Sequence, residues 1–258
     1  ALTVTSRWEG AALPKTGSTG GDKCRGGGRY YFTVEWGAVA EGAPASLPLE
    51  LNVAIEQGVG DAGIAPDPAP VDFVAPSGPD TPVTGGGSFN VATALPGSGR
   101  YTDTLQRGEF VFYKVRVGWG RGLAYRVRFL ATPARGLENI SVVDTTLYSP
   151  SRKEIDNDFG SYYGETHLLP ANATAVATPA VRYRNRESRD TDVAAAAVAG
   201  WYYLAVKVGP AHTDSPDARP VPIELEVAVT GSPEPGPTYL GADQDADPPA
   251  YAVEPDYT

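Results

Sequence analysis

The chain has 258 residues, including 30 Gly and 24 Pro, and its net charge is −10 at pH 7. So many Gly and Pro residues are typical of short strands joined by turns, and the acidic balance argues against nucleic acid as a partner. No apolar run approaches the roughly 20 residues of a membrane helix, so we expect no membrane insertion by this segment.

The first two predicted strands are residues 28–37, GRYYFTVEWG, and residues 47–55, LPLELNVAI. Apolar and polar residues alternate along both, as in strands with one buried face. Both recur near the other end of the chain, as GWYYLAVKVG at 200–209 and VPIELEVAV at 221–229, with ten of nineteen aligned positions identical. The chain therefore contains an internal repeat, and we expect the two strands of each copy to form a hairpin.

The first copy has few residues in front of it, so we expect it to lack the early strands of the module. Its apolar strand faces then need cover, and we expect residues 1–57 to pack against the complete module, a second copy of the chain or a separate upstream fragment. Cys24 is the one cysteine of the chain, so no disulfide partner exists within it and we expect a free thiol.

Two segments have the composition of connectors. Residues 58–88 contain six Pro and a run of three Gly, and residues 232–258 are acidic and rich in Pro. Neither composition favours a helix or a sheet.

The complete module is expected between these connectors. Alternating residues on two predicted strands should face inward, and these are Val111, Tyr113, Val115 and Val117, then Leu123, Tyr125, Val127 and Phe129. Arg126 and Arg128 should face outward, and residues 140–150 should form another strand. For the Ala-rich segment 192–200 we favour an extended chain over a helical turn.

These elements predict an all-β fold, an antiparallel β-sandwich of the jelly-roll-like type with one complete module and a partial first copy. We assign residues 1–57 to the C-terminal half of the first module, 58–88 to a linker, 89–231 to the complete module and 232–258 to the tail.

Residues 97–117, GSGRYTDTLQRGEFVFYKVRV, the turn LYSPSRKEI at 147–155 and the strand GWYYLAVKVG carry a family resemblance. The chain resembles bacterial pre-peptidase C-terminal-like β-sandwich modules, as in the extracytoplasmic region of actinobacterial cell-envelope proteins that carry von Willebrand A-type domains. The resemblance implies an extracellular or cell-surface location and a membrane anchor after Thr258. Its motifs are structural, so it implies no catalytic residues.

A calcium site is the one metal site that the residues suggest. Glu154, Asp156, Asp158 and Glu165 stand at positions 1, 3, 5 and 12 of an EF-hand-like spacing. Gly160 falls one place too late for the sharp turn of such a loop, so a solvated acidic turn is favoured and we expect no other cofactor.

Aromatic residues suggest a second binding hypothesis. Trp119, Tyr162 and Tyr163 could together form a sugar- or peptide-binding patch beside the acidic residues, because aromatic faces suit carbohydrate C–H groups. The alternative is that Trp119 covers the end of the sandwich while the tyrosines cover its edge.

The sequence shows no recognisable set of catalytic residues. His167 and His212 are the two histidines, and neither has a nucleophile motif nearby. The basic run 182–189, RYRNRESR, could form a polyanion site with aromatic neighbours such as Tyr183, but a solvated face whose arginines pair with acidic residues is favoured. The sequence therefore favours a non-enzymatic spacer or interaction module whose partner is an envelope protein or a cell-wall glycan. The alternative is a carbohydrate- or substrate-binding accessory domain of a secreted hydrolase.

Overall fold

The structure is a computed structural model that describes residues 50, 56, 58–132, 140–211 and 219–240. The strands predicted for the first repeat copy lie outside the described residues apart from Glu50, as do Cys24 and His212. The packing of residues 1–57 and the free thiol therefore stay predictions. Glu50 and Glu56 form ion pairs with arginines of the complete module, Arg152 at 3.4 Å and Arg186 at 2.7 Å.

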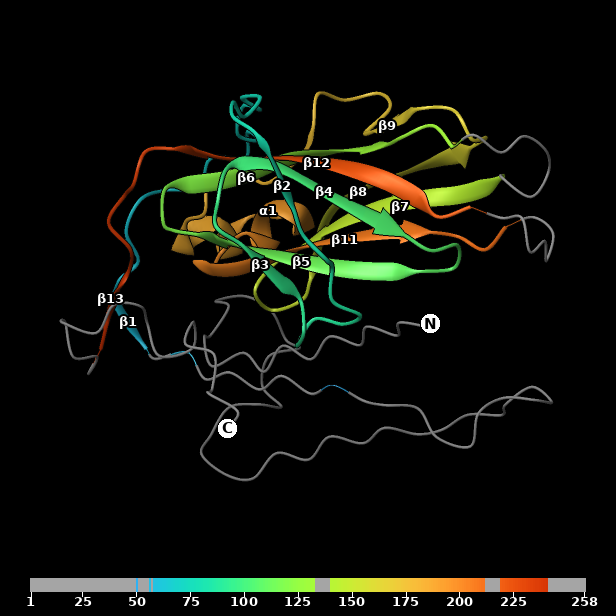
Figure 1. The fold of residues 1–258 in the computed structure, drawn as a ribbon. Coiled ribbons are helices and arrows are strands. Elements are labelled where there is room, and N and C mark those ends of the chain that lie inside the picture. Colours follow the sequence, from blue (N-terminus) through green and yellow to red (C-terminus); the bar gives the residue numbers. More distant parts are fainter. Residues whose placement is uncertain (1–49, 51–55, 57, 133–139, 212–218, 241–258) are drawn as a thin grey trace, which may run out of the picture.

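Two β-sheets pack face to face around one core (Figure 1). The order of strands is β3-β5-β11-β7-β8 in one sheet and β10-β6-β12-β4-β2 in the other, where β9 also pairs with β6. Strand pairs are antiparallel except β2–β4 and β3–β5, which are parallel. This arrangement confirms the predicted all-β sandwich.

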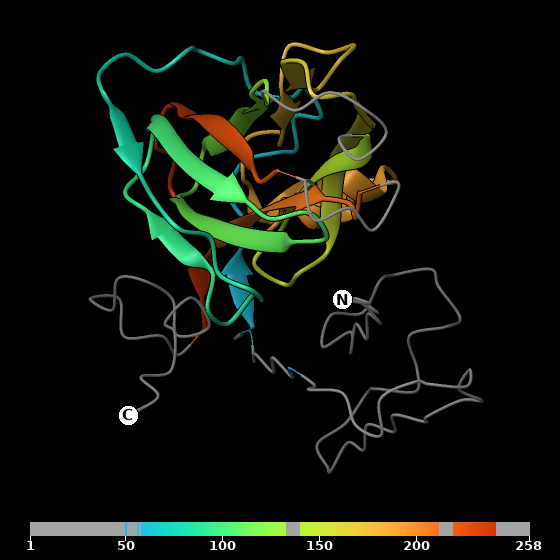
Figure 2. The same ribbon diagram turned by 45° about the vertical axis from the view of Figure 1, so that its right-hand side comes forward.

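The five-stranded sheet consists of β3 (Thr93–Leu95), β5 (Phe110–Val117), β11 (Gly200–Val208), β7 (Ser141–Tyr148) and β8 (Glu154–Tyr162). The six-stranded sheet consists of β10 (Val176–Ala177), β6 (Arg121–Phe129), β12 (Val221–Gly231), β4 (Gly99–Leu105), β2 (Asp80–Pro82) and β9 (His167–Leu169). A separate pair joins β1 (Val59–Asp61) to β13 (Thr238–Tyr239) beside the sandwich (Figure 2). Among the described residues, the helical segments are the 3₁₀ helix η3 (Tyr183–Glu187) and α1 (Thr191–Ala195).

The core confirms the alternation read from the sequence. All the residues expected to face inward on β5 and β6 are buried, as are Tyr202, Leu204, Ile223 and Leu225 of the second repeat copy. A hydrogen-bond chain crosses the core, from the Tyr125 hydroxyl on β6 to the Thr145 hydroxyl on β7 at 2.8 Å, and from Thr145 to the carbonyl oxygen of Ala205 at 3.1 Å. The chain ties the two sheets together with every member buried.

The two strands of the second repeat copy do not form a hairpin. β11 belongs to the five-stranded sheet and β12 to the six-stranded sheet, so the connection between them crosses from one layer to the other. The hairpin prediction was wrong because alternation shows that a strand has one buried face but not which sheet it joins. The two strands face each other across the core.

The segment before β11 contains a helical turn, contrary to the extended chain that we favoured. Asp190 caps α1, and its carboxylate accepts hydrogen bonds from the backbone N–H groups of Asp192 and Val193. Capping and the high helix propensity of alanine outweighed the strand context here.

Parts of the expected linker and tail lie on the sandwich in extended form. β2 adds to the edge of β4, and Gly86 exchanges two backbone hydrogen bonds with Phe112. Phe89 then packs on the outer face of the five-stranded sheet, within a cluster of Phe112, Tyr148 and Tyr203. These contacts place residues 80–92 against both sheets.

Paired charges cover the outer face of the six-stranded sheet. Arg126 and Arg128 on β6 face outward, as predicted, and pair with Glu226 and Glu224 on β12 at 2.6 and 3.0 Å. Opposite charges at directly facing positions stabilise an antiparallel pair. This ladder of ion pairs fits a structural role for the four residues.

Alkaline pH should destabilise the fold through its buried tyrosines. Burial raises the pKa of Tyr113, Tyr125 and Tyr202 far above the ordinary value of about 10. Unfolding lets these phenols ionise, so the stability they support is complete below about pH 10 and falls as the pH rises beyond it. Urea unfolding between about pH 8 and pH 11 should show this loss. Ionisation of all 14 tyrosines before any loss of structure would contradict it.

Candidate functional site

Exposed apolar side chains gather where β7 and β8 form one border of the five-stranded sheet. Val142, Phe159 and Tyr163 are 55%, 67% and 64% exposed. Val142 lies opposite Ser161, and Asp144 lies opposite Phe159, so these residues share the outer face of the sheet. We name Val142, Phe159, Ser161 and Tyr163, together with the backbone of β8 between Asn157 and Ser161, the β8 edge.

The backbone of the β8 edge is unpaired on its outer side at Phe159 and Ser161. Gly209 N–H donates to the carbonyl oxygen of Val142, so Val142 directs its backbone groups toward β11 and Val143 directs its own toward β8. Gly160 lies opposite Val143 and therefore bonds to β7. The alternating residues Phe159 and Ser161 consequently point their N–H and C=O groups away from the sheet, and no described residue bonds to these groups.

Two carboxylates of β8 face the interior side of the strand. Asp158 accepts a hydrogen bond from Ala171 N–H at 2.6 Å, and Asp156 accepts one from Ala177 N–H at 3.0 Å. Burial raises the pKa of Asp156, although the backbone N–H groups that it accepts from act in the opposite direction. Both carboxylates therefore hold the connection that follows β9 against β8.

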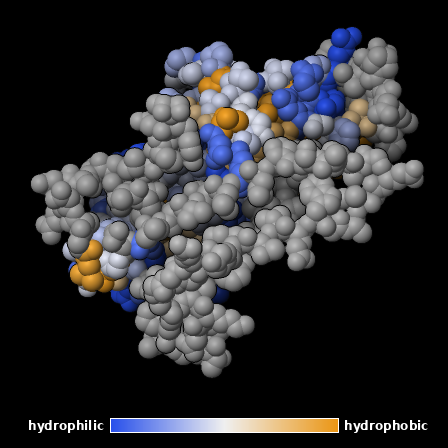
Figure 3. Space-filling view, turned by 90° about the horizontal axis from the view of Figure 1, so that it is seen from below, coloured by the Kyte–Doolittle hydropathy of each residue, from blue (hydrophilic) through white to orange (hydrophobic). Residues whose placement is uncertain are grey.

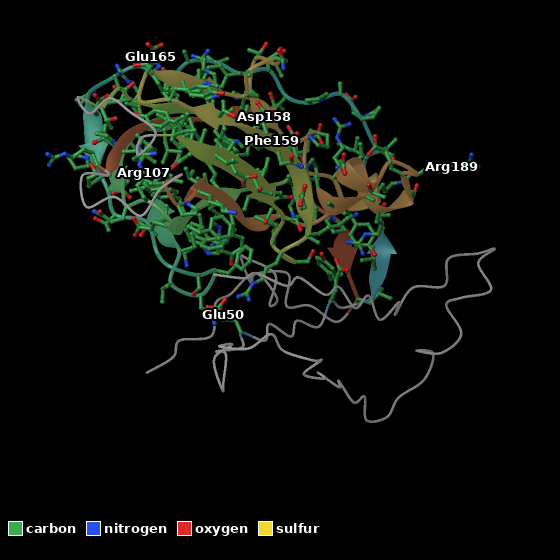
Figure 4. The ribbon with its side chains drawn as sticks, turned by 90° about the vertical axis from the view of Figure 1, so that its right-hand side faces the viewer. Glu50, Arg107, Asp158, Phe159, Glu165 and Arg189 are labelled. Carbon is green, nitrogen blue, oxygen red and sulfur yellow. The ribbon has the colours of Figure 1, made fainter. Side chains whose placement is uncertain are left out.

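The structure does not gather the four proposed calcium ligands around one point. Glu154, Asp156 and Asp158 lie along the extended strand β8 rather than in a loop, and Glu165 follows the end of that strand. In Figure 4 Glu165 lies at the margin of the molecule, apart from Asp158. Within the described ranges, no group of three or more His, Cys, Asp or Glu side chains could hold a metal ion.

Calcium should therefore bind this segment no more tightly than an ordinary acidic surface. We expect calorimetric titration of the protein with calcium to show no dissociation constant below about 1 mM. The Asp158→Asn variant should behave like the wild type. Micromolar binding that Asp158→Asn abolishes would contradict the strand geometry.

The three aromatic candidates do not form one patch. Trp119 precedes β6 and packs against the core and Gly236, whereas the Tyr162 hydroxyl donates to the carbonyl oxygen of Leu130, just beyond the other end of β6. A strand of this length separates the two residues by about 30 Å. Tyr162 is buried, and only Tyr163 of the pair faces solvent.

The arginines of the basic run pair with glutamates, as the sequence suggested. Arg182 binds Glu234 through two nitrogens, at 2.7 and 2.6 Å. Arg186 binds Glu56 in the same manner, at 2.7 and 2.9 Å. These pairs fix η3 to the segment before β13 and to Glu56, so they act as structural clamps rather than as a site for a polyanion.

The polar side chains of residues 97–117, which carry the family resemblance, form hydrogen bonds within the fold. Asp103 accepts hydrogen bonds from the Tyr113 hydroxyl and from Gly85 N–H, each at 2.7 Å. Tyr101 donates to the carbonyl oxygen of Gly97 at 2.9 Å, and Glu109 accepts from Gln106 N–H at 2.6 Å. His167 lies on β9, against Gly160.

The sequence did not single out Phe159 or Val142. A signal was present, since alternation places Phe159 on the outer face if Tyr162 faces inward, and residues 160–181 contain no Lys or Arg. Edge strands commonly carry such charges to prevent pairing with another chain. The sequence alone could not show that β8 is an edge strand.

No protein-family model matches the chain, and no curated protein matches it. Among solved structures, PliG of Aeromonas hydrophila, a periplasmic inhibitor of g-type lysozyme, aligns at 12% identity with a TM-score of 0.29, covering 59% of this chain and 100% of PliG. A mutant VP2 protein of infectious bursal disease virus, from T=1 particles, aligns at 11% identity with a TM-score of 0.31, covering 53% of this chain and 30% of VP2. VP2 of the infectious bursal disease virus subviral particle aligns at 11% identity with a TM-score of 0.27, covering 53% of this chain and 36% of VP2. Likenesses of this size identify no relative.

Proposed function

We propose that the chain is a non-enzymatic interaction module of an extracytoplasmic protein and that it binds a protein partner through the β8 edge. One observation carries the proposal: exposed apolar side chains and unpaired backbone groups coincide there. An extended segment of a partner can add to such an edge, with backbone hydrogen bonds giving affinity and Phe159 giving contact area.

The following charged side chains support this proposal, because each already binds a partner within the chain. Arg182 and Arg186 bind glutamates, Asp103 accepts from the Tyr113 hydroxyl, and Asp156 and Asp158 bind backbone N–H groups. On the face seen in Figure 3, the described residues are mainly hydrophilic, and hydrophobic colour is confined to small separate spots.

Carbohydrate binding by an accessory domain has weaker support. The three aromatic residues that suggested it cannot contact one ligand, because Trp119 and Tyr162 lie at opposite ends of β6 and Tyr162 is buried. A glycan array would support the alternative if Tyr163→Ala removed a signal that Val74→Ala left intact.

The extracytoplasmic location rests on the family resemblance of the sequence. Within the described parts of the chain, no helix is long and apolar enough to cross a membrane. Digestion of intact cells with an added protease tests the location. The proposal expects degradation of the protein while a cytoplasmic marker survives, and protection of both proteins in intact cells would contradict it.

Photo-crosslinking on intact cells tests the binding role. We would place p-benzoylphenylalanine at position 159 and, as a control of similar exposure, at Val74, which is 61% exposed on the segment before β2. The proposal expects a discrete adduct from position 159 only. Excess wild-type protein should suppress the adduct, whereas excess Phe159→Asp protein should not. Equal adducts from both positions, or none from position 159, would refute the β8 edge as the binding surface.

A further inference from the structure

The β8 edge is the long exposed edge among the described strands. The other border strands are short: β3, β2 and β9 have three residues each and β10 has two, whereas β8 has nine. Short border strands offer little to a pairing chain. Pairing with another chain should therefore occur at β8.

The edge residues that would contact a pairing chain carry no charge on the outer face. Asn157, Phe159, Ser161 and Tyr163 are exposed and uncharged, and Phe159 lies midway between Asn157 and Ser161. The irregularity of β8 near Ile155 ends the regular edge on one side, and the end of the strand at Tyr162 limits it on the other. The usable edge is thus about five residues long and centred on Phe159.

From this geometry we infer that a second copy of the chain occupies the β8 edge, with the two β8 strands paired antiparallel about a two-fold axis at Phe159. The inference rests on the proposed function and names its partner. An isologous contact requires a surface that is complementary to itself, and this one is. Phe159 meets Phe159 of the second copy, Asn157 meets Ser161, and Asp158 meets Gly160, so no two carboxylates stand directly opposite each other.

The hydrogen bonds of this pairing can be counted from the directions of the backbone groups. Phe159 points its N–H and C=O outward and exchanges two bonds with Phe159 of the second copy. Ser161 N–H donates to the carbonyl oxygen of Asn157 in each direction, which adds two more. Asn157 N–H already donates to the Asp156 carboxylate, so it contributes only if that contact breaks. Four backbone hydrogen bonds and one aromatic pair therefore hold the dimer.

Repulsion weakens the contact. The two Asp158 residues are diagonal neighbours across the axis, with backbone positions about 7–8 Å apart, and each chain carries a net charge of −10. A small interface of this kind is typical of weak association, so we expect a dissociation constant on the order of micromolar or above. Because salt screens the repulsion, association should strengthen between about 0.01 and 0.15 M salt.

Disulfide trapping tests the register directly. In a Cys24→Ser background, Phe159→Cys would place two thiols at the axis with Cα atoms about 5.5 Å apart, which a disulfide can span. Tyr163→Cys is the matched control, because Tyr163 has nearly the same exposure but lies about 27 Å from its copy across the axis. Mild oxidation should trap a dimer of the Phe159→Cys protein at least about tenfold faster than one of the Tyr163→Cys protein. Equal rates, or none for Phe159→Cys, would overturn the inference.

Sedimentation velocity of the full chain provides the second measurement. Ser161→Pro removes an outward N–H without affecting the bonds to β7, and Phe159→Asp places a charge on the axis. We expect either change to weaken dimerisation at least about tenfold, while the Val74→Asp control dimerises like the wild type. Wild-type protein that is monomeric at every concentration would overturn the dimer. If position 159 nevertheless crosslinks to a different protein on cells, the interaction function stands with another partner, and if it crosslinks to nothing, both proposals fail.

Discussion

Replacing Tyr125 by alanine is expected to lower the free energy of unfolding by about 3–5 kcal/mol. Tyr125 is fully buried between the sheets, so the substitution removes a whole aromatic ring and leaves a cavity. It also removes the hydroxyl that joins β6 to Thr145 on β7. Because typical domains have a stability of about 5–15 kcal/mol, this loss should be plain in urea or thermal unfolding.

The Tyr125→Phe variant separates the two contributions. It keeps the ring and loses the hydrogen bond to Thr145, so it should cost about 1 kcal/mol. A loss below about 1 kcal/mol for Tyr125→Ala would place this side chain outside a close-packed core and contradict the sandwich.

The Phe89→Ala variant should lose about 3–5 kcal/mol as well. Phe89 is 6% exposed, and its ring lies 4.6 to 5.2 Å from the rings of Phe112, Tyr203 and Tyr148. Arg152 stacks on the same ring, at 4.9 Å. Removing the side chain should uncover this aromatic cluster, so binding of a hydrophobic dye should rise together with the loss of stability.

Val91 provides the matched control for Phe89. It lies two residues further along and is 62% exposed, so Val91→Ala should change stability by no more than about 0.5 kcal/mol. Equal small effects of both substitutions would contradict the docking of Phe89 on the outer face of the five-stranded sheet.

The burial pattern of the core could be predicted from the sequence, whereas the pairing of its strands could not. Alternation along β5, β6, β11 and β12 gave the correct inward residues because a strand with one buried face has a period of two. The same alternation is satisfied by either sheet, which is why β11 and β12 were taken for a hairpin. Asp190 ahead of an alanine run could have predicted α1, since an N-cap residue is a local signal.

The candidate site could be predicted less well, because it depends on where β8 lies in the sheet. The spacing of Glu154, Asp156 and Asp158 suggested a loop, but the segment pairs with β7 and turns two of these carboxylates inward. Trp119 and Tyr162 were grouped by residue type, and the length of β6 separates them. Phe159 becomes notable only once β8 is known to be a border strand, which is a property of the whole sheet.

Amide hydrogen exchange along β8 shows whether the outer side of this strand is free to pair with another chain. We expect slow exchange for Asp158 and Gly160, whose N–H groups bond to β7, and fast exchange for Phe159 and Ser161 in dilute protein. At concentrations where the dimer forms, Phe159 and Ser161 should become protected while Asp158 and Gly160 stay unchanged. Protection of Phe159 and Ser161 equal to that of Gly160 at every dilution would contradict this expectation, because it would mean that the outer side of β8 is already covered within one chain.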